Sequence, residues 1–274
     1  MLWQDFLKLL FTFEKTVNFC IVGEMLPLQA LTCVLRIAYI VLRQPFTHDT
    51  IRITHDDKRM GRLTQLMDPK GFYAPFGPAT AEQRHPQFAV RYEGHSCQWN
   101  GPSWPYATSI TLTALANVLN NYKQDVIKKG DYFETLKIYT KSHRLKRENG
   151  RVVCWIDENL NPYTGDWIAR TRLAPSVRGK DYNHSTYCDL VISGLVGLRP
   201  RPDDIVEVNP LVPADTWDWF CLDSVLYHGR LITIVWDKTG EKYNRGKGLR
   251  VYADGQEIAR AETLGRVASS LPKM

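Results

Sequence analysis

The spacing of apolar residues changes once along this chain of 274 residues, near residue 204. Before that point apolar residues recur at steps of three and four, which is typical of helices with one buried face. After that point they alternate with polar residues, which is typical of half-buried strands. The chain is therefore expected to form helices first and a short antiparallel sheet afterwards.

Three helices are predicted in the first region. The first carries its apolar face over residues 107–119, and Pro105 suits its first turn. The second begins at Asp131, which has capping-box spacing with Glu134, and ends before Gly150. The third covers about 183–197. A polar loop over 151–182 joins the last two, and loops of that length inside compact domains are usually functional.

In the later region the alternating pattern predicts four strands, at 220–227, 231–236, 249–253 and 256–259. His228-Gly229-Arg230 is a tight connection, and Asp254-Gly255 is expected to form a type I′ turn because both residues tolerate positive φ. The expected divisions are an atypical apolar segment at 1–60, a helical domain at 61–203, an antiparallel β-domain at 204–262 and a frayed tail at 263–274.

Residues 25–42 are almost free of charge, but Arg36 interrupts them. A membrane helix needs about 20 mainly apolar residues, and a central charge costs about 2.5–3.5 kcal/mol. Three interpretations stay open: an amphipathic or packing helix, which is favoured, a membrane anchor, and a misassigned N-terminus. Asp5 and Glu14 argue against a signal peptide.

The net charge of +6 is mild, and the densest basic run, Lys141–Arg147, lies at a predicted helix end without interleaved aromatic residues. A solvated helix end is favoured there, and nucleic acid is not an expected partner. No CxxC pair, phosphate loop or zinc motif occurs, so no metal or organic cofactor is expected. The six cysteines are expected to be buried small apolar residues: Cys20, Cys33, Cys97, Cys154, Cys188 and Cys221.

Residues 97–106, CQWNGPSWPY, lie directly before the first predicted helix. Indole faces stack on sugar rings and amides bind hydroxyl groups, so Trp99, Asn100 and Trp104 are candidate sugar-binding residues. The alternative is that both tryptophans belong to the core and that Gly101-Pro102 only starts the helix.

Residues 155–167, WIDENLNPYTGDW, place three acids among aromatic and amide side chains. These acids are Asp157, Glu158 and Asp166, and a carboxylate in such a setting is suited to activating water as a general base. Trp155, Asp157 and Trp167 are the candidate binding residues of this segment. Asn-Pro-Tyr-Thr-Gly is also good turn chemistry, and both interpretations stay open. In the segment Asp181-Tyr-Asn-His-Ser185, His184 is either a ligand for a substrate hydroxyl or a structural residue.

Residues 99–105 resemble the W-x-G-P-x-W segment of six-hairpin glycosidases. Residues 158–165, ENLNPYTG, resemble the E-N-Y-N-P-x-T-G segment of glycoside hydrolase family 63 and the mannosylglycerate-hydrolase-like group. The resemblance covers about 62–260 and implies a mainly α fold, a partial (α/α)6 toroid followed by a small antiparallel β-domain. It also implies inverting hydrolysis of an oligosaccharide or glycoside, with Glu158 as general base.

Three features depart from that family, and one is the stretch from Arg172 to Lys180, which is short for the loop that normally leads into Tyr-Asn-His-Ser. Leu160 stands where the pattern usually has an aromatic residue, and no S-G-x-D-like segment supplies the family's general acid. The chain is therefore expected to be a truncated glycoside hydrolase without its acid and without turnover. The alternative is a non-catalytic carbohydrate-binding or pseudoenzyme fragment.

Overall fold

The computed structural model describes residues 61–91, 98–168 and 186–273. The predicted N-terminal segment, His184 and the predicted start of the third helix lie outside these residues, as do Cys20, Cys33 and Cys97. No helix in the part of the chain described has the length and apolar character needed to cross a membrane.

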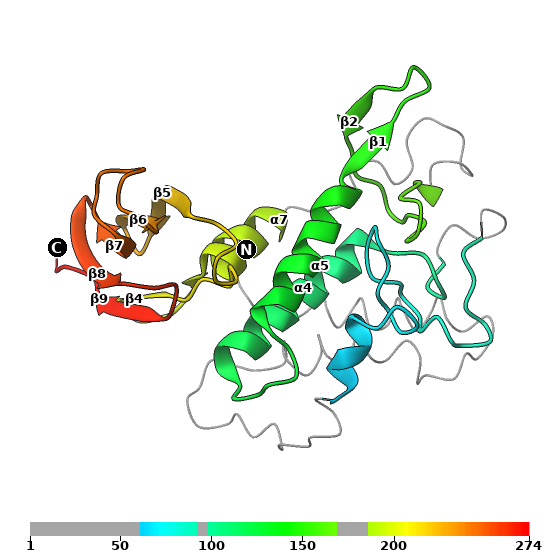
Figure 1. The fold of residues 1–274 in the computed structure, drawn as a ribbon, viewed down its shortest axis with the longest axis horizontal. Coiled ribbons are helices and arrows are strands. Elements are labelled where there is room, and N and C mark those ends of the chain that lie inside the picture. The colour runs from blue at the N-terminus through cyan, green and yellow to red at the C-terminus, as the bar shows by residue number, and fades with distance from the viewer. Residues whose placement is uncertain (1–60, 92–97, 169–185, 274) are drawn as a thin grey trace.

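Two long helices, α4 (Pro105–Asn121) and α5 (Lys129–Ser142), form an antiparallel hairpin at the centre of the molecule (Figure 1). Pro105 occupies the first turn of α4, as its fixed φ and missing N–H predict. The start of α5 differs from the prediction: Lys128 is the N-cap, and the Asp131 carboxylate accepts a hydrogen bond from the Lys128 N–H at 2.7 Å. The helix therefore begins at Lys129, before the predicted Asp131.

Helix α7 (Thr186–Asp189) continues into a π-helical segment, η2 (Leu190–Val196). Gly197 ends it with a φ of 86°, a left-handed conformation that glycine adopts without steric cost. Tyr132 fixes this segment against α5, because its hydroxyl donates to the Leu190 carbonyl at 2.7 Å. The remaining helical element among the residues described is the 3₁₀ turn η1 (Gly61–Leu66).

Nine strands form three antiparallel sheets in the described residues. A hairpin of β1 (Arg144–Lys146) and β2 (Val152–Cys154) projects beyond the end of α5 (Figure 1). The second sheet has the order β3 (Leu198–Arg199), β4 (Ile205–Val208), β9 (Val267–Ser270). The third is a meander of β5 (Trp219–Tyr227), β6 (Arg230–Asp237), β7 (Gly248–Ala253) and β8 (Gln256–Ala261).

The hairpin predicted at Asp254-Gly255 is confirmed. Ala253 pairs with Gln256, and the two turn residues have φ values of 48° and 84°. Strand β9 lies within the segment that was expected to be a frayed tail, and it pairs with β4. Local sequence patterns do not report a pairing between strands so far apart in the chain.

The expectation of a mainly α fold with a partial (α/α)6 toroid is wrong. The described residues contain three α-helices and three antiparallel sheets, and they do not form a toroid. The prediction extended the family's helical architecture to segments of this chain whose own residues form strands. The expectation of buried cysteines is also wrong for Cys154, Cys188 and Cys221, which are free thiols on exposed residues.

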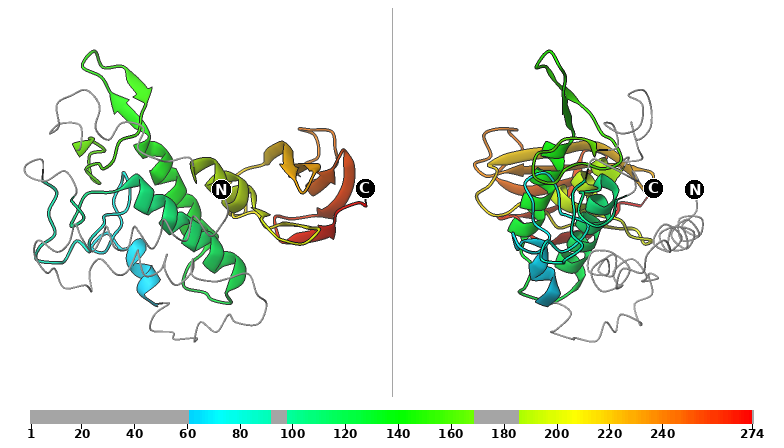
Figure 2. Two further views of the ribbon diagram at one scale, coloured as in Figure 1. Left: turned by 180° about the vertical axis from the view of Figure 1, so that it is seen from behind. Right: turned by 90° about the vertical axis from the view of Figure 1, so that its right-hand side faces the viewer.

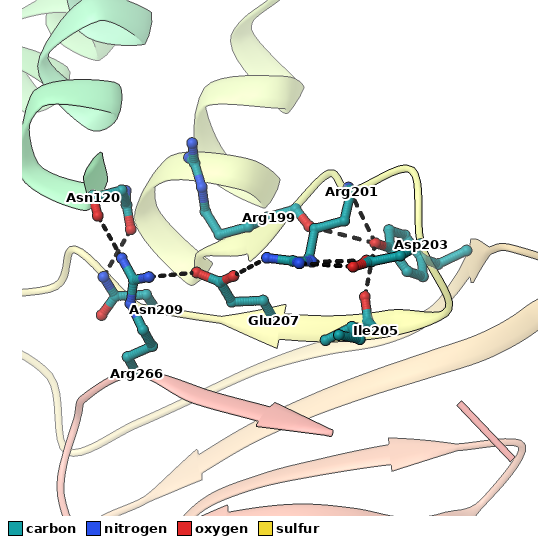
Figure 3. Close-up of polar contacts among 9 residues, drawn as sticks. Asn120, Arg199, Arg201, Asp203, Ile205, Glu207, Asn209 and Arg266 are labelled. Atoms are coloured by element: carbon teal, nitrogen blue, oxygen red, sulfur yellow. Dashed lines mark hydrogen bonds and ion pairs between the residues drawn. The ribbon is translucent and has the colours of Figure 1, made fainter. Parts of the chain in front are cut away.

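One hydrophobic core runs from the helical hairpin into the sheets. It includes Leu112 and Leu115 of α4, Tyr132 of α5 and Ile232 and Ile234 of β6. Polar contacts also join the helical hairpin to the sheets at the edge of this core (Figure 3). We call these contacts the polar junction. Asn209 donates to the Asn120 side chain at 2.7 Å. Glu207 accepts from Arg201 at 2.8 Å and forms an ion pair with Arg266 at 2.9 Å.

The β5–β8 sheet lies at one end of the molecule, and the irregular loops before α4 lie at the other (Figure 2). The basic run predicted to be a solvated helix end begins with Lys141 in the last turn of α5 and continues into β1, and Lys141, Arg144, Lys146 and Arg147 are exposed.

Candidate functional site

The two loops that the sequence singled out are joined by their backbones. Ser103 and Leu160 exchange two N–H···O hydrogen bonds, both of 2.9 Å. Leu160 also forms a bridge with Trp167, and the Ile168 N–H donates to the Asn159 carbonyl at 3.0 Å. The segment around Glu158 is therefore fixed to the segment that starts α4.

Residues 71–91 support both loops, a role that the sequence analysis did not predict. The Phe76 N–H donates to the Pro162 carbonyl at 3.0 Å, and the Thr80 hydroxyl donates to the Pro102 carbonyl at 2.8 Å. The Tyr163 hydroxyl donates to Gln83 at 2.6 Å. The run of Pro and Gly residues at 75–78 was the available signal for an irregular loop, but it does not reveal what the loop contacts.

The Asn-Pro-Tyr-Thr-Gly segment is a turn, as its composition predicts. The Asn161 side chain accepts from the Tyr163 N–H at 2.9 Å and from the Thr164 N–H at 3.3 Å. Gly165 has a φ of 79°, and a Cβ at this position would lie 2.6 Å from the Phe76 ring. The turn chemistry thus holds the loop in shape, which is compatible with a functional role for Glu158.

Among the candidate tryptophans, Trp104 and Trp167 are buried. Their indole N–H groups donate to backbone carbonyls, of Gln98 at 2.7 Å and of Arg144 at 2.7 Å. Trp99 stacks on Trp104 with ring centroids 4.1 Å apart, and it is half-buried, as is Trp155. Trp104 and Trp167 thus brace the loops, while Trp99 and Trp155 reach the surface.

Asn100 holds the loop to residues 87–89. Its side-chain amide donates to the Gln87 carbonyl at 2.8 Å, and its own carbonyl accepts from the Ala89 N–H at 2.9 Å. Gly101 allows this approach, because a Cβ there would lie 2.2 Å from the Ala89 carbonyl oxygen. The described contacts of Asn100 are therefore structural, and its predicted contact with sugar hydroxyls stays a prediction.

Asp157, Glu158 and Asn159 are consecutive but differ in burial. Asp157 and Asn159 are fully buried, whereas Glu158 keeps partial exposure. The Trp155 indole N–H donates to the Asp157 carboxylate at 2.9 Å. Glu158 is thus a partly exposed residue between two fully buried neighbours.

His143, at the end of α5, anchors the start of the Glu158 loop. Its carbonyl accepts from the Trp155 N–H at 3.2 Å, and its ring Nδ1 contacts the Tyr139 carbonyl at 2.6 Å. Burial lowers the pKa of His143, which keeps the imidazole neutral at pH 7. Only its place in the basic run drew attention to this residue in the sequence.

The remaining candidates are placed as follows. Asp166 is exposed and accepts from the Thr164 hydroxyl at 2.6 Å, and His184 lies outside the described residues. Leu160, where the family pattern has an aromatic residue, is buried between its two backbone bridges. Within 61–91, 98–168 and 186–273, no group of three His, Cys, Asp or Glu side chains has the arrangement of a metal site.

Comparisons with known proteins bear on both halves of the chain. Residues 45–185 match the family model described as the mannosylglycerate hydrolase MGH1-like glycoside hydrolase domain. Residues 198–260, which contain β3–β7 and all of β8 except its last residue, match the C-terminal domain of glycosyl hydrolase family 65. A solved structure named "Sialidase" is 44% identical, with a TM-score of 0.72.

That structure covers 86% of this chain, while this chain covers 20% of the solved chain and so spans about one fifth of its length. The resemblance to glycosidases drawn from the two motifs is confirmed. Because the first match spans more than half of the chain and includes both loops joined at Leu160, this chain belongs to the mannosylglycerate hydrolase MGH1-like glycoside hydrolase family.

Proposed function

We propose that this chain supplies the general-base side of an inverting O-glycoside hydrolase, with Glu158 as the residue that activates water. The observation that carries this proposal is the setting of Glu158, a partly exposed residue between two fully buried ones. Its loop is bonded to a second aromatic loop through Ser103 and Leu160. A general base must be held still beside water, and this setting meets both requirements.

In the proposed reaction the Glu158 carboxylate accepts a proton from a water molecule. The water oxygen attacks the anomeric carbon, and the bond from that carbon to the leaving oxygen breaks on the opposite face of the sugar. The leaving oxygen takes a proton from a general acid. No segment of this sequence resembles the family's acid, so the proposal assigns that role to no residue of this chain.

The proposed substrate is an oligosaccharide or glycoside. Trp99 and Trp155 are half-buried and are proposed to contact the sugar, with Trp104 and Trp167 supporting their loops from beneath. Asp157 is proposed to orient the Trp155 indole through their hydrogen bond. His184 is proposed as a ligand for a hydroxyl group. The name of the similar solved structure adds sialosides to the glucosides, mannosides and rhamnosides that merit testing.

Glycosyl fluorides test Glu158 without the general acid, because departing fluoride does not require protonation. The full chain is expected to hydrolyse a fluoride of the correct sugar with inversion at the anomeric carbon. Glu158→Gln removes the proton acceptor with little change in shape, and the rate should fall by about 10²–10⁴. Glu148→Gln is the matched control, since Glu148 is exposed near the tip of the β1–β2 hairpin.

A Glu158→Gln variant that keeps more than about a third of the rate would overturn the assignment, because general-base catalysis contributes far more. Asp157 would then be the next candidate. Ordinary glycosides are expected to remain intact, because their leaving oxygen needs an acid. Hydrolysis of such a glycoside that disappears in Glu158→Gln would instead place an acid within this chain.

The second candidate function is carbohydrate binding without catalysis, as a pseudoenzyme or fragment, and the missing acid segment favours it. Its signature is binding of a sugar by the full chain with no hydrolysis of any fluoride in the panel. The affinity should then depend on Trp99 and Trp155, and Glu158→Gln should not abolish it.

A further inference from the structure

A second group of exposed aromatic residues lies at the start of β5, at the opposite end of the molecule from the loops before α4 (Figures 1 and 2). Trp217 is 39% exposed and Trp219 is 50% exposed. Large exposed aromatic side chains usually mark a binding surface. Around them lie four charged residues, and we call the whole group the β5 surface: Asp215, Trp217, Asp218, Trp219, Lys238 and Lys242.

We propose that the β5 surface binds a neutral carbohydrate chain. This inference goes beyond the proposed function, since the surface shares no residue with the Glu158 site and requires no catalysis.

Both indole rings of the β5 surface are held in place. Trp217 packs edge-on against Phe133 of α5, with ring centroids 5.7 Å apart, and its carbonyl accepts from the Trp236 indole N–H at 2.9 Å. The Lys242 ammonium lies 4.2 Å from the Trp219 ring centroid, and Tyr243 meets that ring at 83°. Rings that are already ordered lose little entropy when a ligand stacks on them.

The loop that holds Trp219 is itself built around a buried carboxylate. Asp237, the last residue of β6, accepts from the Gly240 N–H at 2.8 Å and from the Tyr243 N–H at 2.9 Å. These bonds position Lys242 and Tyr243 beside Trp219. The exposed Trp219 ring is therefore held by residues that this loop positions.

The charges of the β5 surface balance. Lys238 lies 2.9 Å from the Asp215 carboxylate and 3.4 Å from that of Asp218, and Lys242 lies over Trp219. Two carboxylates and two ammonium groups leave no net charge to attract an anionic polymer such as nucleic acid. Together they offer acceptors and donors, which suits hydroxyl groups that do both.

A protein partner is disfavoured by the same composition. The buried centres of protein interfaces are depleted in Lys and Asp, and here those residues stand directly beside the exposed rings. Flat indole faces next to hydroxyl-binding side chains instead match the alternating apolar and polar faces of a sugar chain.

The test is native affinity electrophoresis of the full chain in gels that contain soluble glucan, mannan or, separately, an acidic polygalacturonate. At least one neutral polymer is expected to retard the chain. Trp219→Ala should weaken that affinity at least about tenfold, because it removes an aromatic anchor. Leu226→Ala is the matched control, since it removes a 73% exposed apolar side chain from the same strand. It should leave retardation unchanged.

Asp218→Ala is a second variant, in case Trp219→Ala does not fold. Asp218 is an exposed acid, and its removal leaves both rings in place. This variant should also weaken retardation. Unchanged retardation in Trp219→Ala would overturn the proposal, as would retardation by the acidic polymer alone. A change in oligomeric state of Trp219→Ala with no change in sugar binding would point to a second copy of the chain and would also overturn it. Glu158→Gln should keep full retardation, which separates this inference from the proposed hydrolase.

Discussion

Gly165 and Gly150 share a left-handed φ of 79°, but their surroundings differ. A Cβ on Gly150 would meet nothing within 4 Å, whereas a Cβ on Gly165 would lie 2.6 Å from the Phe76 ring. Gly165 closes the turn that follows Glu158 and lets it rest on residues 71–91. At the scale of single residues, the glycine in the family's Thr-Gly pair is therefore required by close packing as well as by backbone conformation.

The two glycines make a matched pair of substitutions. Alanine in a left-handed conformation costs about 1–2 kcal/mol, and both variants should lose that amount. Gly165→Ala should lose about a further 1–3 kcal/mol because its methyl group overlaps Phe76. Urea unfolding of both variants measures the difference. Equal losses would mean that Phe76 moves aside freely, and the loop would then be less firmly held than its contacts suggest.

At the scale of a single element, the loop between β6 and β7 is organised by the Asp237 carboxylate. Asp237 is buried, and burial alone would raise its pKa. Hydrogen bonds from the backbone N–H groups of Tyr243, Gly240, Thr239 and Lys242 outweigh burial, so the pKa of Asp237 is lowered. One carboxylate thus organises the loop that presents Lys242 and Tyr243 to Trp219.

This loop should make stability depend on pH in a defined direction. A carboxylate with a lowered folded pKa contributes stability above its unfolded pKa of about 3.9 and loses that contribution as the pH falls through the folded value. Asp237→Asn places an amide donor among N–H donors, so it should cost about 1–3 kcal/mol at neutral pH. The difference from the unaltered chain should shrink below about pH 4.

Urea unfolding at several pH values measures this difference. Glu241→Gln is the control, because Glu241 is an exposed acid of the same loop. A difference between Asp237→Asn and the unaltered chain that stays constant down to the lowest pH would show that ionised Asp237 does not stabilise the loop.

Local signals in the sequence were sufficient for some elements. The three- and four-residue apolar spacing predicted α4, and Asp254-Gly255 predicted the β7–β8 turn. The β1–β2 hairpin was missed because each of its strands has only 3 residues and these residues are exposed or only half-buried, which is too short a segment for a pattern to be recognised. Strand β9 was missed because its pairing with β4 joins residues far apart in the chain.

The sequence likewise predicted only part of the candidate site. Its residues were predicted from composition and from the two family motifs, but the Ser103–Leu160 pairing is a contact between distant segments that no local pattern reports. The burial of Trp104 and Trp167 depends on that pairing. Composition alone therefore did not separate tryptophans that brace the loops from those that reach the surface.

At the scale of the whole molecule, the helical hairpin and the sheets share a core and a polar junction (Figure 3). Glu207 of β4 is the centre of that junction, because it forms ion pairs with both Arg201 and Arg266. Arg266 also donates to the carbonyl of Asn120, at the end of α4. The segment just before β9 is thus tied to the helical hairpin as well as to its own sheet.

Glu207 and Asp203 allow this junction to be tested, since both bind Arg201 but the Glu207 side chain is much less exposed than that of Asp203. The Glu207 side chain is 12% exposed, and its removal leaves Arg201 and Arg266 facing each other without a shared carboxylate. Glu207→Ala should therefore destabilise the chain by about 1.5–3 kcal/mol, the usual contribution of hydrogen bonds to charged groups that are partly shielded from water. Asp203→Ala should have a much smaller effect, because exposed ion pairs contribute little.

Urea unfolding followed by far-ultraviolet circular dichroism and by tryptophan fluorescence measures both variants. The two signals should change together in the unaltered chain, because one core joins the helices to the sheets. If the junction couples the two regions, Glu207→Ala should shift both signals or pull them apart into two transitions. A loss in Glu207→Ala no larger than that in Asp203→Ala would show that the shared apolar core, and not the arginine–glutamate contacts, holds the sheets to the helical hairpin.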